Sequence, residues 1–415
     1  MQNTNHKSSG VIRGVLQDLV ANNLFPSGNG VKNWYKDKGY LGNTDQERFN
    51  DFLQKQSQEG GYYKNEFDGL DGISRDSVNL NTPYIRNAKL DMVKFAPKED
   101  HELPGCGKHI VNFFGANTYY EGNFRDMANE AKATGAAVYG FNYPGFNSSN
   151  GKVKEFADLV DSGIAVINKL IEQGIKPDDI ILQGDCFGAA VAEKVKQHLK
   201  ENSIYVRSVN SNSFVSFESA VYDFFDKSSL LRPFKGIVSL LLQYTGWAAD
   251  VSDVVIRQDP FLFQMQRAED GVLINAQLKK HIEGNIASGV ANICPESYIA
   301  ARDALEAKSL VKLKAEHQID KHGVRNEPHM MDLYQLEGQN GESVFSIINE
   351  YLTASNEFLK NHSPNAGVAL RAVEDVVRLQ VIVTNEEAQQ LQDLANVVRL
   401  NPELLPVINN AQQIF

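Results

Sequence analysis

The sequence contains little cysteine and no long apolar run. Only three of its 415 residues are cysteine, Cys106, Cys186 and Cys294, and none belongs to a CxxC pair. A disulfide framework is therefore excluded, and a reducing compartment is the simplest expectation. The longest apolar stretch, residues 236–247, is interrupted by polar residues and falls short of the roughly 20 residues that span a bilayer. We expect a soluble protein with no integral membrane segment.

Positive charge is also scarce. The chain has 41 Lys and Arg against 52 Asp and Glu, which gives a net charge of −11. An acidic surface without a basic cluster disfavours nucleic acid and anionic membranes as main partners. Residues 1–10 are polar and lack the apolar core of a secretory signal peptide, so we expect a cytoplasmic protein.

Sequence signatures for cofactors are missing. There is no G-x-x-x-x-G-K-[ST] loop, and no G-x-G-x-x-G opens a helix after the first predicted strand. His317, Asp320, His322 and His329 lie close in sequence, but they form no HExxH pair and have no cysteine nearby. We therefore expect neither a nucleotide cofactor nor a metal ion.

What the sequence does contain is a regular alternation of predicted strands and helices. Strands are predicted at residues 77–81, 89–95, 109–114, 136–141, 180–182, 204–209, 261–266 and 309–313, and helices at 11–24, 122–134, 156–173 and 187–199. From the third strand onward, each strand is followed by a connection long enough for a crossover. This alternation predicts an α/β fold with a mostly parallel central sheet flanked by helices.

The same sequence pattern suggests how the chain is divided into segments. Residues 1–72 form a helical and irregular extension, and residues 73–360 form the α/β core. An apolar stretch within the core is predicted to be an inserted cap at about residues 214–255. Residues 361–415 are expected to be a helical extension that packs on the core or on a protein partner.

The most informative motif is G-D-C-F-G at residues 184–188, between the apolar residues 180–182 and a predicted helix. A sharp strand-to-helix turn, the nucleophile elbow, strains its central residue and needs very small side chains two positions before and after it. Gly184 and Gly188 meet this need, and the helix dipole would lower the pKa of Cys186. The alternative is a buried structural cysteine in an ordinary crossover.

These residues resemble the α/β-hydrolase superfamily, in its version with cysteine in place of serine. The resemblance covers residues 73–351. The sequence N-F-F-G-A-N at 112–117 is similar to the family's loop after the third strand, and N-Y-P-G-F at 142–146 to the loop after the fourth. The run G-I-K-P-D-D-I at 174–180 is similar to the approach to the elbow strand. The resemblance implies an α/β-hydrolase fold.

The resemblance also implies an oxyanion hole. Its two donors would be the backbone N–H groups of Phe187 and Ala116. Two positions depart from the common pattern. Phe114 stands where many members have histidine, and Cys186 stands where most have serine. The second departure leaves the substrate class open.

The family order of nucleophile, acid and histidine implies the remaining members of a triad. Asp270, soon after a predicted strand and followed by Gly-Val, is the expected acid, with Glu269 as the alternative. His329, in the sequence N-E-P-H-M-M-D-L, is the expected base, and His322 beside a glycine is the alternative. The implied triad is Cys186, His329 and Asp270.

The resulting expectation is a cysteine-dependent acyl hydrolase. It would cleave a carboxylic ester or thioester of a small-molecule or acylated substrate through a thioacyl-enzyme, and the cap would form an apolar acyl pocket. A cysteine peptidase, an acyltransferase, a dienelactone-type hydrolase and a catalytically inactive binding module are the alternatives. The polar, Asn-rich N-terminal residues resemble hydrolases that bacteria inject into host cells, which gives an alternative location.

Overall fold

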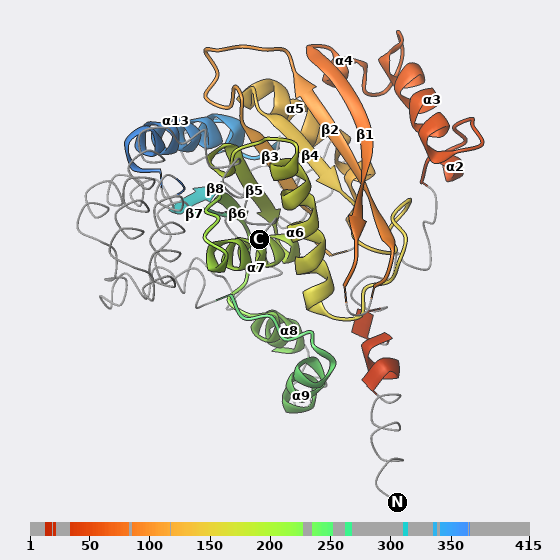
Figure 1. Ribbon diagram of the computed structural model, residues 1–415, viewed down its shortest axis with the longest axis vertical. Coiled ribbons are helices and arrows are strands. Elements are labelled where there is room, and N and C mark those ends of the chain that lie inside the picture. Colours follow the sequence, from red (N-terminus) through yellow and green to blue (C-terminus); the bar gives the residue numbers. More distant parts are fainter. Residues whose placement is uncertain are drawn as a thin grey trace, which may run out of the picture.

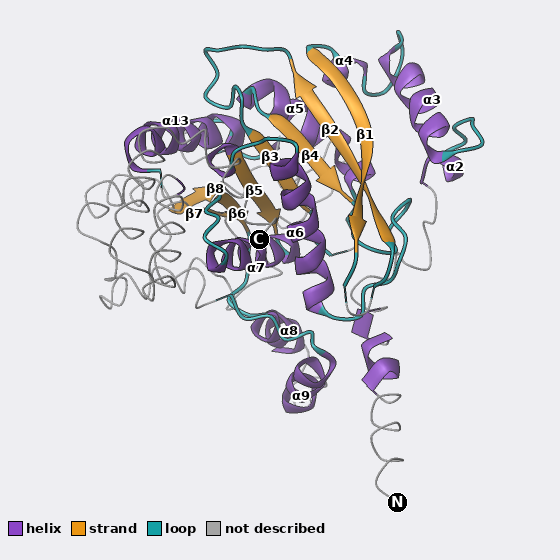
Figure 2. Cartoon of the chain, in the orientation of Figure 1, coloured by secondary structure: helices purple, strands orange, loops and turns teal. Residues whose placement is uncertain are grey.

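The computed structural model places a large sheet between two layers of helices (Figures 1 and 2). It describes residues 13–18, 20–21, 34–82, 85–116, 118–226, 235–251, 262–267, 310–313, 335–337, 341–363 and 365.

Eight strands form the sheet in the order β1-β2-β4-β3-β5-β6-β7-β8. Their bounds are β1 (Leu70–Leu80), β2 (Ala88–Pro97), β3 (His109–Phe113), β4 (Ala137–Phe141), β5 (Ile180–Asp185), β6 (Arg207–Ser211), β7 (Leu262–Arg267) and β8 (Leu310–Leu313). β2 pairs antiparallel with β1 and β4, whereas all pairs from β4 to β8 are parallel. This order and these directions are those of the α/β-hydrolase fold, so the predicted fold class is confirmed.

The described helices are α2 (Trp34–Asp37), α3 (Asp45–Ser57), α4 (Lys64–Phe67), α5 (Phe124–Thr134), α6 (Phe156–Glu172), α7 (Phe187–Glu201), α8 (Phe217–Asp226), α9 (Lys235–Thr245) and α13 (Val344–His362). The buried side chains of α6 and α7 share one core cluster with Val111, and those of α5 and α13 share the other with its neighbour Ile110. Because successive strand residues point to opposite faces, the two clusters lie on opposite sides of the sheet.

The first strand is longer than the sequence pattern predicts. β1 begins at Leu70 rather than at residue 77, and it pairs with β2 as far as Pro97. β1 is an edge strand whose first half carries exposed polar side chains, so its hydrophobic alternation is weak. The backbone pairing, and not an apolar pattern, extends this strand.

The N-terminal extension, predicted to be helical and irregular, is helical at residues 13–18 and 20–21 and contains three further helices, α2, α3 and α4. α2, α3 and α4 pack on α5 through aromatic rings. The rings of Phe52 and Phe124 stack with centroids 4.9 Å apart, and Phe52 meets Trp34 edge to face at 5.7 Å. Aromatic side chains bury a large area each, which explains how such short helices are held in place.

The cap region leaves and rejoins the core at one point. Phe217 N–H donates to the Ala249 carbonyl over 2.7 Å, and Val251 N–H donates to the Val215 carbonyl over 2.9 Å. These hydrogen bonds hold the two ends of the cap segment side by side, and α8 and α9 project beyond them (Figure 1).

Candidate active site

The turn after β5 has the geometry of a nucleophile elbow. Cys186, between the last residue of β5 and the first of α7, has φ 52° and ψ −117°. A non-glycine residue at positive φ is strained and persists only where its surroundings fix it. Two hydrogen bonds hold it: Cys186 N–H donates to the Ser211 carbonyl over 2.9 Å, and Ala189 N–H donates to the Cys186 carbonyl over 3.2 Å.

The two glycines of the motif have no room for a side chain. A Cβ atom at Gly188 would lie 2.1 Å from the carbonyl oxygen of Phe113 and 2.4 Å from that of Phe114. A Cβ atom at Gly184 would lie 2.3 Å from the Cα atom of Ala189. These are backbone atoms that no rotamer change can move aside, so the elbow requires glycine at both positions.

The loop after β3 approaches the same turn. A Cβ atom built on Gly115 would lie 3.6 Å from the Cβ atom of Cys186, so the loop passes directly beside the cysteine. Ala116 follows it and is partly exposed, as Cys186 is. Thr118 N–H donates to the Gly115 carbonyl over 3.2 Å, which folds the loop back. The expected oxyanion donors Ala116 and Phe187 therefore lie on the two segments that meet at Cys186.

The base of the cap packs on the residue after the cysteine. The Phe187 ring is buried and lies 5.2 Å from the ring of Phe217 in α8, edge to face, and 5.5 Å from the ring of Phe156. Trp247, fully buried, lies 6.5 Å away and donates from Nε1 to the Lys154 carbonyl. Aromatic side chains from α6, α7 and both ends of the cap thus hold the base of the cap on the core beside the elbow. The predicted acyl pocket of the cap stays a prediction.

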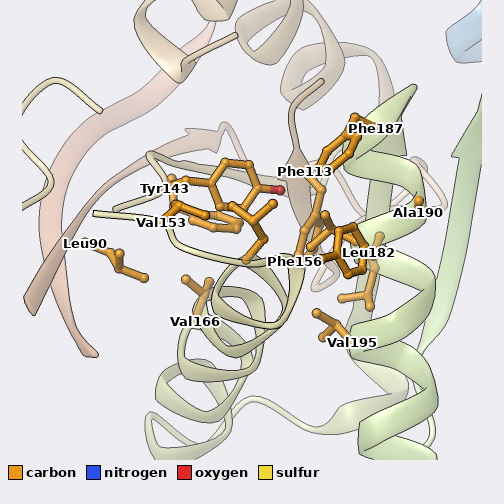
Figure 3. Close-up of a cluster of buried hydrophobic side chains, with 14 of the residues drawn as sticks. Leu90, Phe113, Tyr143, Val153, Phe156, Val166, Leu182, Phe187, Ala190 and Val195 are labelled. Carbon is orange, nitrogen blue, oxygen red and sulfur yellow. The ribbon is translucent and has the colours of Figure 1, made fainter. Parts of the chain in front are cut away.

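A buried hydroxyl in the same apolar cluster has no hydrogen-bond partner among the described residues. Tyr143, in the loop after β4, is 2% exposed, and no partner for its hydroxyl occurs among the described residues. Figure 3 shows this hydroxyl directed toward Phe113, the last residue of β3. Burial raises the pKa of Tyr143, so the group is a neutral donor. The sequence pattern drew attention to this loop but not to this hydroxyl.

Ser211 is a second such group. It ends β6, is almost fully buried, and its carbonyl accepts the Cys186 N–H. Its Oγ atom has no hydrogen-bond partner in the part of the chain that the structure describes. A polar residue in a central strand could have drawn attention to it, but sequence alone gives no distance to the elbow.

A buried carboxyl group, that of Glu130, is linked through Asn112 to Gln183, which lies three residues before Cys186. Glu130 of α5 accepts from Asn112 Nδ2 over 3.0 Å, and Asn112 Oδ1 accepts from Gln183 Nε2 over 3.0 Å. Gln183 is directly before Gly184 in β5. Burial raises the pKa of Glu130 to about 7, although the amide donors act in the opposite direction. A buried carboxyl group with a pKa near neutrality is thus connected by hydrogen bonds to β3 and β5.

Another buried network fixes the loops after β3 and β4. Glu121 accepts from Asn142 Nδ2 over 3.0 Å and from Asn147 Nδ2 over 2.8 Å. Asp91 of β2 accepts from Arg75 Nε and from the Tyr120 hydroxyl, each over 2.6 Å. Burial, together with the charge of Asp91, raises the pKa of Glu121 to about 8. These contacts position the two loops that border the elbow.

The expected acid and base lie outside the described residues. Asp270 and Glu269 follow the end of β7 by three and two positions, and His322 and His329 come after β8. Since β5 to β8 are parallel, the ends of β7 and β8 lie on the same sheet edge as Cys186. The chain therefore leaves β7 and β8 at the end of the sheet where Cys186 lies, and the roles of Asp270 and His329 stay predictions.

Comparisons with known proteins show only distant similarity. No family model matches the sequence, and no curated protein matches it. A hyperthermophilic esterase of Pyrobaculum calidifontis overlaps with a TM-score of 0.41 at 13% identity, covering 83% of this chain and 98% of that chain. An alpha-beta hydrolase of Vibrio vulnificus overlaps with a TM-score of 0.41 at 15% identity, covering 66% and 86%. A Pyrococcus furiosus esterase overlaps with a TM-score of 0.37 at 16% identity, covering 55% and 82%.

The strand order and the turn after β5 define the fold. Among the described helices, none is long and apolar enough to cross a membrane.

Proposed function

We propose that the protein is a cysteine-dependent acyl hydrolase with Cys186 as its nucleophile. The observation that carries the proposal is the strained elbow, in which a half-buried thiol stands at the N-terminus of α7 with no space for side chains at Gly184 and Gly188. Strain of this kind costs on the order of 1–3 kcal/mol and is typical of functional positions.

The proposed reaction is the hydrolysis of an ester or thioester. His329, oriented by Asp270, takes the thiol proton of Cys186, and the thiolate attacks the carbonyl carbon. The N–H groups of Phe187 and Ala116 stabilise the oxyanion. The carbon–oxygen or carbon–sulfur bond to the leaving group then breaks, and His329 returns the proton to the alcohol or thiol. Water, deprotonated by His329, releases the carboxylic acid and restores the thiol.

The first test compares cysteine reactivity within one chain. Iodoacetamide labelling near pH 6, measured by peptide mass spectrometry, should be faster at Cys186 than at an ordinary thiol. In the proposed pair His329 takes the thiol proton of Cys186, whereas an ordinary thiol with a pKa of about 8.5 is almost fully protonated at this pH. Cys106 is a matched control, since its Sγ atom also lies near a histidine, 3.4 Å from His101 Nδ1. If Cys186 and Cys106 were labelled at equal rates, both in the unaltered chain and in His329→Ala, the result would contradict an activated pair of Cys186 and His329.

The second test is hydrolysis of p-nitrophenyl esters and acyl thioesters. Cys186→Ala should lower the rate by about 10³-fold or more. His329→Ala should have a larger effect than His322→Ala, and Asp270→Asn a larger one than Glu269→Gln. Full activity in Cys186→Ala would overturn the proposal, and a larger loss at residue 322 or 269 would reassign that role. If peptides alone were cleaved, or acyl groups passed to another acceptor, the peptidase or acyltransferase alternative would hold.

A further inference from the structure

Three side chains that can bind a metal ion come together on the loop between β2 and β3. Glu99, His101 and Cys106 each offer one ligand atom, and these atoms all lie within 4.8 Å of one another. The Cys106 Sγ atom is 3.4 Å from His101 Nδ1, and a Glu99 carboxylate oxygen is 3.3 Å from His101 Nε2. We refer to Glu99, His101 and Cys106 as the loop cluster. In the part of the chain that the structure describes, no other three such side chains converge in this way.

The distance between the sulfur and the nitrogen atom fits a shared zinc ion. A Zn–S bond of about 2.3 Å and a Zn–N bond of about 2.0 Å, set at a tetrahedral angle, place the two ligand atoms roughly 3.6 Å apart. The distance from Cys106 Sγ to His101 Nδ1, 3.4 Å, is close to this value. The side chain of Glu99 is 75% exposed, so its carboxylate can turn toward a metal ion at Nδ1 without displacing a buried group.

The loop is fastened to the core beside the cysteine. Gly105 N–H donates to the Thr134 carbonyl at the end of α5 over 2.9 Å. Asn356 of α13 donates from Nδ2 to the Pro104 carbonyl over 2.7 Å. Both anchors lie within two residues of Cys106, so its thiol is held in place before a metal ion arrives. A ligand that is already fixed loses little conformational freedom on binding.

The charge around the loop cluster favours a cation. Residues 98–102 are Lys-Glu-Asp-His-Glu, with three acidic side chains against one lysine, and all five are exposed. Lys108, on the other side of the cysteine, forms an ion pair with Asp179 over 2.5 Å. An acidic surface segment raises the local concentration of cations. Among divalent cations, thiolate and imidazole ligands suit zinc, whereas magnesium and calcium prefer oxygen.

We propose that the loop cluster binds a zinc ion or another divalent metal that prefers nitrogen and sulfur ligands. His101 Nδ1, Cys106 Sγ and one carboxylate oxygen of Glu99 would be the protein ligands, and water would take the fourth position. Cys106 binds as the thiolate, and its proton passes to the solvent. The sequence pattern alone predicts no metal ion, because the spacing E-x-H-x-x-x-x-C contains neither a CxxC nor an HExxH pair.

The loop cluster is separate from the proposed active site. β3 begins at His109, directly after the loop, whereas Cys186 follows the end of β5, and β3 and β5 are parallel. The two cysteines therefore lie at opposite ends of the sheet. Metal binding by the loop cluster does not depend on the proposed hydrolase activity.

The test is titration of the full chain with Co²⁺, which replaces zinc in such sites and absorbs in the near ultraviolet when a thiolate binds it. The Cys186→Ala chain is used throughout, so that the proposed catalytic thiol cannot contribute. We expect a band that saturates at one Co²⁺ per chain, that Zn²⁺ removes and that Mg²⁺ leaves unchanged. A further Cys106→Ser substitution should abolish the band. His101→Gln should lower the apparent affinity by about tenfold or more, because it removes a ligand.

The matched control is Glu102→Gln. Glu102 is on the same loop and is exposed as Glu99 is, so Glu99→Gln and Glu102→Gln remove the same charge. Only Glu99→Gln should weaken Co²⁺ binding strongly. Zn²⁺ should also slow the alkylation of Cys106 by iodoacetamide, with Cys294 as the reference thiol. Absence of the band, a band that survives Cys106→Ser, a Cys106 thiol that Zn²⁺ does not protect, or equal losses in the two glutamate variants would overturn the proposal.

Discussion

Around the turn at Cys186, polar atoms are enclosed, whereas on α9 apolar side chains are exposed. The hydroxyls of Tyr143 and Ser211 are buried near the elbow with no partner among the described residues, and a methyl group at Gly188 would meet backbone at 2.1 Å. In α9, Ile237 and Leu240 are about two-thirds exposed, and Gly236 has open space around it. The first region is constrained by close packing, and the second is exposed to solvent.

This difference predicts how strongly a substitution in each region changes the free energy of unfolding. A buried polar atom without a hydrogen bond costs roughly 1–3 kcal/mol, and an overpacked site costs a similar amount or more. Exposed positions usually change the free energy of unfolding by less than about 0.5 kcal/mol. Substitutions near the elbow should therefore change the free energy of unfolding far more than those on the exposed side of α9.

The largest expected effect is that of Gly188→Ala. Its methyl group cannot fit against the carbonyls of Phe113 and Phe114 without moving β3 or α7. We expect the free energy of unfolding to fall by about 3 kcal/mol or more, measured by chemical denaturation, with loss of any esterase activity. A variant as stable as the unaltered chain would show that the elbow is not tightly enclosed.

The next effect concerns pH and Glu130. The folded pKa of about 7 exceeds the ordinary value of 4.5, so the folded state binds the proton more tightly than the unfolded chain. The stabilising contribution is complete below pH 4.5 and is lost as the pH rises to about 7, after which it stays constant. Glu130→Gln should not show this loss. The free energy of unfolding of the variant minus that of the unaltered chain should therefore rise by roughly 2–3 kcal/mol from pH 4.5 to pH 7.

Denaturation curves at several pH values check this expectation. Glu121, whose pKa is about 8, contributes in the same direction and will remain in the variant. Glu99→Gln, at an exposed side chain, is the control and should leave the pH profile unchanged. An identical profile in Glu130→Gln and the unaltered chain would show that Glu130 is not enclosed.

A smaller effect is expected at Tyr143. Tyr143→Phe removes a buried hydroxyl that has no partner in the described part of the chain and keeps the ring. The free energy of unfolding should rise by about 1 kcal/mol, because the cost of burying the hydroxyl disappears. Tyr62→Phe, at a ring that is 66% exposed, is the matched control and should have no measurable effect. A loss of stability in Tyr143→Phe would mean that the hydroxyl has a partner in the folded protein.

The smallest effect is expected at Gly236, in the exposed helix α9. Gly236 is in the first turn of α9 and has no heavy atom within 4 Å of an added Cβ. Gly236→Ala should raise the free energy of unfolding by about 0.5 kcal/mol, because alanine loses less conformational freedom in a helix. A destabilised variant would show that the start of α9 is packed, contrary to its exposure.

The comparison also explains which sequence predictions were accurate. The strands β3, β4 and β5 lie within a few residues of the predicted positions because both faces of these strands are buried and each contains a short run of apolar residues. β6 is shifted toward the C-terminus, to Arg207–Ser211 from the predicted 204–209. Buried polar residues in β6, such as Ser208, which accepts from Lys196 Nζ over 2.8 Å, hide it from a hydrophobic pattern.

By itself, the sequence determined the α/β class and the location of the elbow, because hydrophobic alternation and the need for glycine at residues 184 and 188 are local properties of the chain. Only the tertiary structure decided the length of β1, the packing of α2 to α4, and the buried state of Glu130 and Tyr143. Each depends on residues far apart in the sequence. Burial, and hence the proton affinity of a carboxyl group or the cost of a lone hydroxyl, arises only when such segments meet.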